Sequence, residues 1–131
     1  MNQFWEKGIK EFNQQEFYAC HDTLEEIWMD SVEPDKTFYQ GILQIAVACY
    51  HLSNSNWRGA VILLGEGCKK LREYEPDYFN IDVSNLFKNS YDLLIALQQI
   101  NPDSVTEFYL KLINNQLENN LTFPHIIKLG E

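Results

Sequence analysis

Hydrophobic residues recur along this chain at helical spacing, and they do not alternate with the two-residue period of a β-strand. The most apolar stretch runs from Phe38 to Leu52 and has apolar side chains around most of a helical wheel. A helix of that kind belongs in the middle of a domain because it has almost no face suited to water. We therefore predict a central helix over about residues 36–53, with Pro34 suited to its first turn.

The same spacing predicts five further helices. They cover residues 2–13, residues 15–30, the segment from Asn56 to Glu75, the segment from Asp82 to about Gln99, and a last segment that begins at Asn101-Pro102. Asn56, Asp82 and Asn101 are expected N-caps, since their side chains accept hydrogen bonds from free backbone N–H groups. Short turns favour antiparallel neighbours, so the expected architecture is a single all-α domain of six helices over residues 1–131.

Two further features of the fold follow from particular residues. Gly8, Gly65 and Gly67 lie within predicted helices, where glycine is costly, so we expect close helix packing at each. After the last helix, the tail from Leu121 is too apolar to remain in water. We expect the tail to pack on the body through Phe123, Ile126 and Ile127, so that residues 82–131 form the C-terminal helices and a docked tail.

Composition excludes several classes of partner. The 131 residues are 45% hydrophobic and carry a net charge of −9, with no cluster of Lys and Arg. Nucleic acid and anionic membrane surfaces are therefore excluded as partners. Residues 38–52 are too few to span a bilayer. Cys20, Cys49 and Cys68 are odd in number and widely spaced, which favours free buried thiols; with no visible secretory signal, we expect a cytoplasmic protein.

Polar side chains on two neighbouring predicted helices form the candidate site. On the central helix, Gln40, Gln44 and His51 share a strip about 40° wide. On the preceding helix, His21, Glu25 and Trp28 share a face at spacings of four and three residues. We predict that the two strips face each other as a buried polar seam, because a buried polar group without a partner costs about 1–3 kcal/mol. The candidate polar-seam cluster also includes Glu16 and Asn56.

Two interpretations of the seam remain open, and so does the question of enzymatic activity. In the first, the seam is a structural network without a cofactor, in an interaction or scaffold domain that binds a protein partner or forms a homo-oligomer. In the second, His21, Glu25 and His51 bind a divalent metal ion in a small metal-binding protein or a metal-dependent enzyme. Asp22 and Glu26 are rotated by about 100° from that face. The acidic residues Glu25, Glu26, Asp30 and Glu33 are expected to be hydrated surface.

Three motifs carry a resemblance to a known family. They read F-N-x-x-E-F-Y-x-C-H-D-x-L-E-E-x-W, F-Y-Q-G-I-L-Q-I-A-V-A-x-Y-H-L and N-W-R-G-A. In this order they resemble the uncharacterised bacterial and plastid family named domain of unknown function 309, over about residues 5–75. The resemblance implies a compact all-helical domain and no particular activity. The positions it marks as characteristic are Glu16, His21, Glu25, Trp28, Gln44, His51, Asn56 and Gly59.

Overall fold

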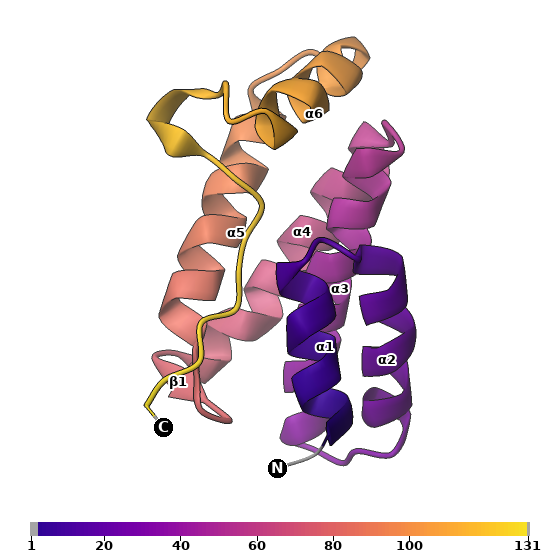
Figure 1. Ribbon diagram of the computed structural model, residues 1–131, viewed down its shortest axis with the longest axis vertical. Coiled ribbons are helices and arrows are strands. Elements are labelled where there is room, and N and C mark those ends of the chain that lie inside the picture. Colours follow the sequence, from indigo (N-terminus) through magenta and orange to yellow (C-terminus); the bar gives the residue numbers. More distant parts are fainter. Residues whose placement is uncertain (1–2, 131) are drawn as a thin grey trace.

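The computed structural model describes residues 3–130, and it confirms the all-α prediction (Figure 1). Within those residues the chain forms six α-helices joined by short turns. They are α1 (Gln3–Asn13), α2 (Phe17–Met29), α3 (Asp35–Ser53), α4 (Trp57–Leu71), α5 (Val83–Gln98) and α6 (Val105–Ile113). Three short 3-10 turns, Arg72–Tyr74, Pro102–Ser104 and Glu118–Asn120, follow α4, precede α6 and follow α6, respectively.

The central position of α3 is confirmed by its contacts and its burial. It packs against α4 on one side and against α2 on another, and α1 in turn packs on α2. Phe38, Ile42, Ile45, Cys49 and Leu52 of α3 are all fully buried. The apolar circumference of this stretch thus corresponds to a helix enclosed by its neighbours.

The predicted N-caps are in place. The side chain of Asn56 accepts a hydrogen bond from the Gly59 N–H at 2.9 Å, and the side chain of Asp82 accepts one from the Asn85 N–H at 2.9 Å. Asn101 accepts one from the Asp103 N–H at 2.8 Å, although it caps the 3-10 turn that leads into α6 and not α6 itself. The first two caps fix where α4 and α5 begin, and the third fixes where the 3-10 turn before α6 begins.

A small hairpin between α4 and α5 was not predicted. Its strands, β1 (Asp77–Tyr78) and β2 (Ile81–Asp82), are antiparallel and have two residues each, too few to show alternation. Phe79 and Asn80 make the turn with positive φ values of 45° and 62°. The hairpin places the rings of Tyr78 and Phe79 at 4.8 and 5.6 Å from the ring of Phe38, so it extends the aromatic core.

Close packing is confirmed at two of the three glycines. A Cβ at Gly8 would lie 2.8 Å from Cδ2 of Leu24, so α1 packs closely against α2 there. A Cβ at Gly67 would lie 2.7 Å from Cδ1 of Ile45 and 2.8 Å from the carbonyl oxygen of Gly41, so α4 approaches the backbone of α3 there. At Gly65 no atom lies within 4 Å, and the prediction is wrong because this position faces outward.

The C-terminal segment packs on the body, as predicted, and passes between α1 and α5 (Figure 1). The side chain of Asn13 donates to the carbonyl of Ile126 at 2.9 Å and accepts from its N–H at 2.7 Å. Phe123 and Ile126 are buried, whereas Ile127 is 45% exposed, contrary to the prediction. Ile127 instead contributes its backbone carbonyl, which accepts a hydrogen bond from the Asp82 N–H at 2.9 Å.

Candidate functional site

The predicted polar seam is not buried as a unit. Glu16, Glu25 and Asn56 are exposed, and the other five members, His21, Trp28, Gln40, Gln44 and His51, are half-buried. The reason lies in α2, whose buried side is centred on Cys20, Leu24 and Ile27. His21 and Glu25 lie about 90° and 130° around the helix from that centre, so neither belongs to the buried side.

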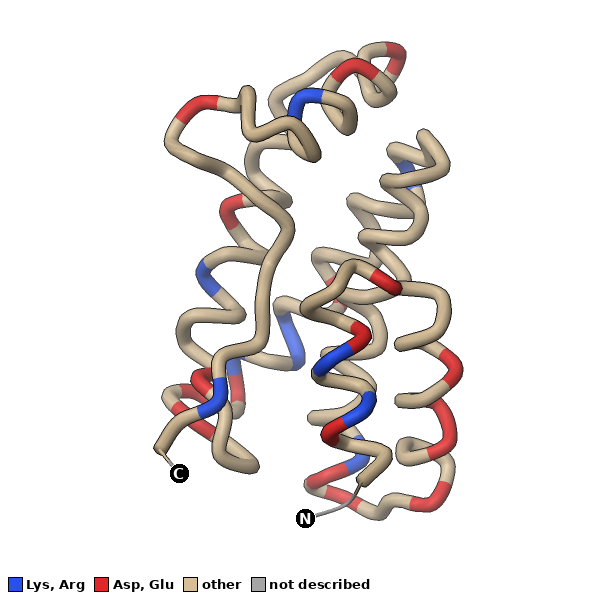
Figure 2. Tube along the Cα trace, viewed as in Figure 1, with Lys and Arg blue, Asp and Glu red and all other residues tan. Residues whose placement is uncertain are grey.

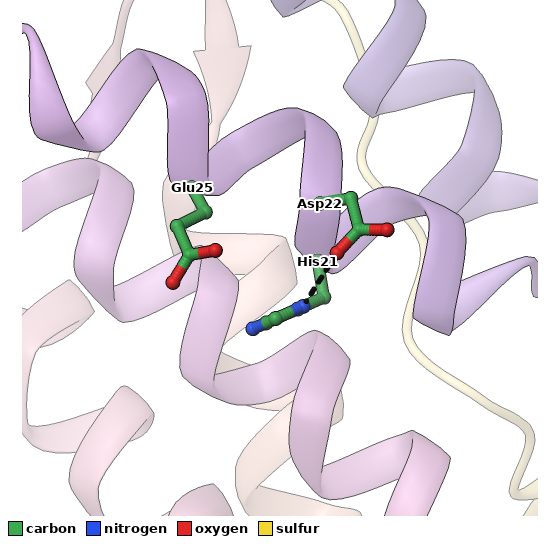
Figure 3. A group of neighbouring side chains, drawn as sticks. All are labelled: His21, Asp22 and Glu25. Carbon is green, nitrogen blue, oxygen red and sulfur yellow. Dashed lines mark hydrogen bonds and ion pairs between the residues drawn. The ribbon is translucent and has the colours of Figure 1, made fainter.

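His21 has its partner on its own helix (Figure 3). Its Nδ1 lies 3.2 Å from Oδ1 of Asp22, and the ring directs its other nitrogen toward the side on which Glu25 lies. One ligand atom from each of His21, Asp22 and Glu25 falls within 4.8 Å of the others. Asp22, which the helical wheel placed off this face, therefore joins the group. Its side chain turns back toward the neighbouring histidine.

His51, the third residue of the predicted metal set, has a different environment. Its Nδ1 accepts a hydrogen bond from Nδ2 of Asn56 at 3.2 Å, and it is not part of the group around His21. A Cβ at Gly59 would lie 2.8 Å from Cδ2 of His51, so glycine leaves room for the imidazole. His51, Asn56 and Gly59 thus form a local structure at the α3–α4 turn.

Trp28, Gln40 and Gln44 are half-buried. The Lys36 ammonium lies 4.5 Å from the ring centroid of Trp28, a cation–π contact that covers the indole. Nε1 of Trp28 and Oε1 of Gln44 are buried without a hydrogen-bond partner in the described part of the chain. The described seam residues therefore do not form one hydrogen-bonded network: His21 pairs with Asp22, His51 pairs with Asn56, and Oε1 of Gln44 has no partner.

The outer side of α2 is strongly acidic (Figure 2). Asp22, Glu25, Glu26 and Asp30 are exposed and follow one another at i, i+3, i+4 and i+8, so they share one face, which we name the acidic face of α2. Residues 11–35 contain eight Asp and Glu and no Lys or Arg. The other eleven acidic residues are nearly balanced by all ten Lys and Arg, so this one segment accounts for almost the whole net charge.

Two large apolar side chains are exposed on the same face. Tyr18 precedes Asp22 by one turn and is 59% exposed, and Met29 precedes Asp30 and is 65% exposed. The ring of Tyr18 lies 5.3 Å from that of Tyr50 on α3. Large apolar side chains are exposed on other elements too, so the particular feature of this face is that they lie among carboxylates. This combination was not predicted from the sequence, although the charge distribution alone could have indicated it.

The three cysteines are free and buried, as predicted. Burial raises the pKa of the Cys20 and Cys68 thiols to about 12 and raises the pKa of the Cys49 thiol as well. Because the thiolate is the nucleophile, these thiols are chemically inert in the folded protein. None of the three therefore contributes to the candidate site.

Part of this chain is similar in sequence to known proteins. Residues 5–63 match the family model described as "Domain of unknown function (DUF309)", so the resemblance to that family is confirmed for this part of the chain. Over 58 residues the chain is also 34% identical to the "Uncharacterized protein YpuF" of Bacillus subtilis (strain 168). That match covers 44% of this chain and 33% of the relative, so the chain matches about a third of the relative's length.

The matched segment contains most of α1, all of α2 and α3 and the beginning of α4, and therefore the acidic face of α2 and the His21 group. Neither the family description nor the relative's name specifies an activity. In the described residues, no helix combines the length and the hydrophobicity needed to cross a bilayer. The function must therefore be argued from the site itself.

Proposed function

We propose that this chain is a helical protein-interaction domain, and that the acidic face of α2 binds a basic segment of a partner protein. The observation that supports this most strongly is the charge distribution, since residues 11–35 hold eight acidic side chains and no basic one. Clustered negative charge on one face attracts and orients a positively charged partner. The exposed Tyr18 and Met29 add apolar area, which charge alone does not supply.

The partner is more simply a different protein than a second copy of this chain. Two copies that met through the acidic face of α2 would bring like charges together, which is unfavourable at an interface. A basic segment with interspersed apolar residues would satisfy both the carboxylates and the exposed Tyr18 and Met29. We therefore expect a monomer in solution by light scattering.

The proposal is tested by the binding of a fluorescein-labelled peptide of alternating arginine and leucine, followed by fluorescence anisotropy. We expect binding that weakens as ionic strength rises from about 0.01 M to about 1 M, because the Debye length falls from about 30 Å to about 3 Å. A peptide of alternating glutamate and leucine should not bind. In the variant with Glu25→Gln, Glu26→Gln and Asp30→Asn, we expect affinity to fall by about tenfold.

The matched control removes three exposed carboxylates from elsewhere, with Glu73→Gln, Glu75→Gln and Glu118→Gln. Both triple variants lose the same net charge, so general attraction between an acidic protein and a basic peptide falls equally in each. We expect the control to bind nearly as well as the wild type. If the two triple variants bind alike, the acidic face of α2 is not the interaction surface.

Divalent metal binding is a second candidate function, favoured by the proximity of His21, Asp22 and Glu25. One imidazole nitrogen and two carboxylates within 4.8 Å provide ligands of the kind that zinc binds. The hydrogen bond between Asp22 and Nδ1 of His21 leaves the other ring nitrogen, on the side of Glu25, free for an ion. In this arrangement Asp22 replaces His51 in the set predicted from the sequence.

Thermal unfolding with and without zinc tests the second candidate. Zinc at 100 times its dissociation constant would stabilise the protein by about 2.7 kcal/mol. His21→Ala should abolish that increment, and His51→Ala should preserve it, because His51 bonds to Asn56 instead. A melting temperature that zinc does not change would exclude this function. If His21→Ala and His51→Ala both abolish the stabilisation by zinc, the metal ligands are instead those predicted from the sequence, with His51 among them.

A further inference from the structure

A groove opens where the beginning of α2, the end of α3, α6 and the C-terminal segment meet. Its volume is about 380 Å³, within the range of about 300–1,000 Å³ that small-molecule sites occupy. The residues that line it are Gln15, Glu16, Phe17, Tyr18, Ala19, Tyr50, Ser53, Tyr109 and Phe123. Because Tyr109 and Phe123 lie outside residues 5–63, the matched helices alone do not complete it.

Aromatic rings dominate the groove. Phe17 and Phe123 are buried with ring centroids 5.1 Å apart, and the ring of Tyr109 lies 6.3 Å from that of Phe123. These three rings form an apolar base. The more exposed Tyr18 and Tyr50, with centroids 5.3 Å apart, form one side of the mouth. The groove therefore has aromatic rings at its mouth and an apolar surface at its base.

The charge at the groove has one sign. Glu16 is the charged residue of its lining, and among the described lining residues there is no Lys or Arg. Through Tyr18 the groove is continuous with the acidic face of α2, which begins one helical turn further along. A carboxylate beside aromatic rings favours a cation, because ring faces carry partial negative charge.

We propose that this groove receives an arginine side chain from a basic partner segment. The methylene stem would lie on the Phe17 and Phe123 rings, and the guanidinium would stack on Tyr18 or Tyr50 and pair with Glu16. Arginine fits better than lysine, since a planar guanidinium both stacks on a ring and forms two parallel hydrogen bonds to a carboxylate. A basic partner would bring that arginine, so the role of the groove rests on the proposed function.

The direct test is a nuclear magnetic resonance titration of the full chain with two small probes, N-acetyl-arginine amide and N-acetyl-citrulline amide. Citrulline has nearly the same shape as arginine and no charge. We expect arginine to shift the backbone amide signals of Tyr18, Ala19 and Ser53 saturably, and citrulline to bind about tenfold more weakly. Equal binding of the two probes would overturn the proposal, and so would arginine shifts that do not saturate.

Point variants test the two parts of the groove. Glu16→Gln removes the carboxylate, and Tyr18→Leu removes a ring while keeping apolar volume; both positions are exposed, so the variants should fold. Each should weaken arginine binding by about fivefold. Tyr91→Leu, a change of another exposed tyrosine, on α5, is the control and should bind like the wild type. Wild-type affinity in both groove variants would show that arginine binds elsewhere.

The same variants separate this inference from the proposed function. The triple change at Glu25, Glu26 and Asp30 should weaken the binding of the arginine–leucine peptide but leave the binding of N-acetyl-arginine amide unchanged. If the groove does not distinguish arginine from citrulline while the peptide still needs the acidic face, the groove inference is wrong and the interaction surface stands. If the groove binds arginine more tightly than citrulline, but the arginine–leucine peptide binds the triple variant as tightly as the wild type, the proposed function is wrong instead.

Discussion

Helices α2 and α4 both pack against the central helix α3, yet their outward surfaces differ. On α4, Arg58, Lys69 and Lys70 accompany Glu66, and Lys70 Nζ lies 3.6 Å from Oε1 of Glu66. Similar ion pairs one turn apart lie on α5 and α6, between Lys88 and Asp92 and between Lys111 and Glu107. On α2 the exposed carboxylates have no Lys or Arg beside them in sequence.

This difference separates the scaffold from the surface available to a partner. Among the described residues, Asp22 pairs with His21, but no ion pair to Lys or Arg is formed by Glu25, Glu26 or Asp30. Like charges on this face therefore repel one another with little compensation. The fold does not require it, since α2 is held by its buried side. Substitutions in the scaffold should therefore affect stability, and substitutions on the acidic face of α2 should affect binding.

The largest expected effect on stability comes from the C-terminal segment, part of the scaffold. Deletion of residues 121–131 exposes the surfaces that Phe123 and Ile126 cover and removes both hydrogen bonds to Asn13. At about 1.5–3 kcal/mol for each large buried side chain, the free energy of unfolding should fall by about 3–6 kcal/mol. Urea unfolding measures it; an unchanged midpoint would show that the segment is not part of the scaffold.

The next effect contrasts two glycines of α4. In Gly67→Ala the new Cβ would lie 2.8 Å from the carbonyl oxygen of Gly41, and backbone cannot move aside cheaply, so we expect a loss of about 1–3 kcal/mol. Gly65→Ala is the matched control, because no atom lies within 4 Å and helix propensity should give a gain of about 0.5–1 kcal/mol. Equal effects of the two changes would mean that α4 does not approach α3 closely.

A smaller effect concerns Asp35, an acidic residue of the same segment that does have a structural partner. The Tyr78 hydroxyl donates to Asp35 Oδ1 at 2.5 Å, and this hydrogen bond raises the pKa of Tyr78 to about 12. A raised pKa means that the stabilisation is complete below the ordinary value of about 10 and is lost as pH rises from there to about 12.

Tyr78→Phe should therefore cost about 1 kcal/mol at neutral pH, and the difference from the wild type should shrink across that alkaline window. Chemical unfolding at several pH values measures the difference. A gap that stays constant up to pH 12 would contradict the assigned cause of the shift.

The smallest effect on stability should come from the acidic face of α2 itself. The triple change Glu25→Gln, Glu26→Gln and Asp30→Asn should alter the free energy of unfolding by no more than about 0.5 kcal/mol, because these side chains are exposed. A slight gain is the expected sign, since repulsion between like charges is relieved. Calorimetry checks this; a loss comparable to that of Gly67→Ala would place these residues in the scaffold.

The fold was largely predictable because its signals are local. Apolar spacing identified α3, and the hydrogen-bonding side chains of Asn56 and Asp82 marked the beginnings of α4 and α5. The β1–β2 hairpin was missed because strands of two residues have no periodicity. The outward position of Gly65 depends on the rotation of α4, and the exposure of Ile127 depends on how the tail crosses β2; neither is encoded locally.

The candidate site was less predictable because it depends on side-chain directions and on neighbouring helices. A helical wheel treats Asp22 as turned away from His21, whereas a short side chain can bend back to an adjacent residue. The helical wheel also placed His51 on a strip expected to face α2. In the structure its hydrogen-bond partner is Asn56, five residues later in the chain. The groove joins residues as distant as Glu16 and Phe123, which no local pattern brings together.

The central claim is that the acidic face of α2 is the interaction surface. Its most direct test is a titration of the isotope-labelled full chain with the arginine–leucine peptide, in which the backbone amide signals report where the peptide binds. We predict that the largest shifts fall on α2, from Tyr18 to Asp30, and on Tyr50 beside it. Shifts confined to α4, α5 and α6, or spread evenly over the chain, would contradict the claim.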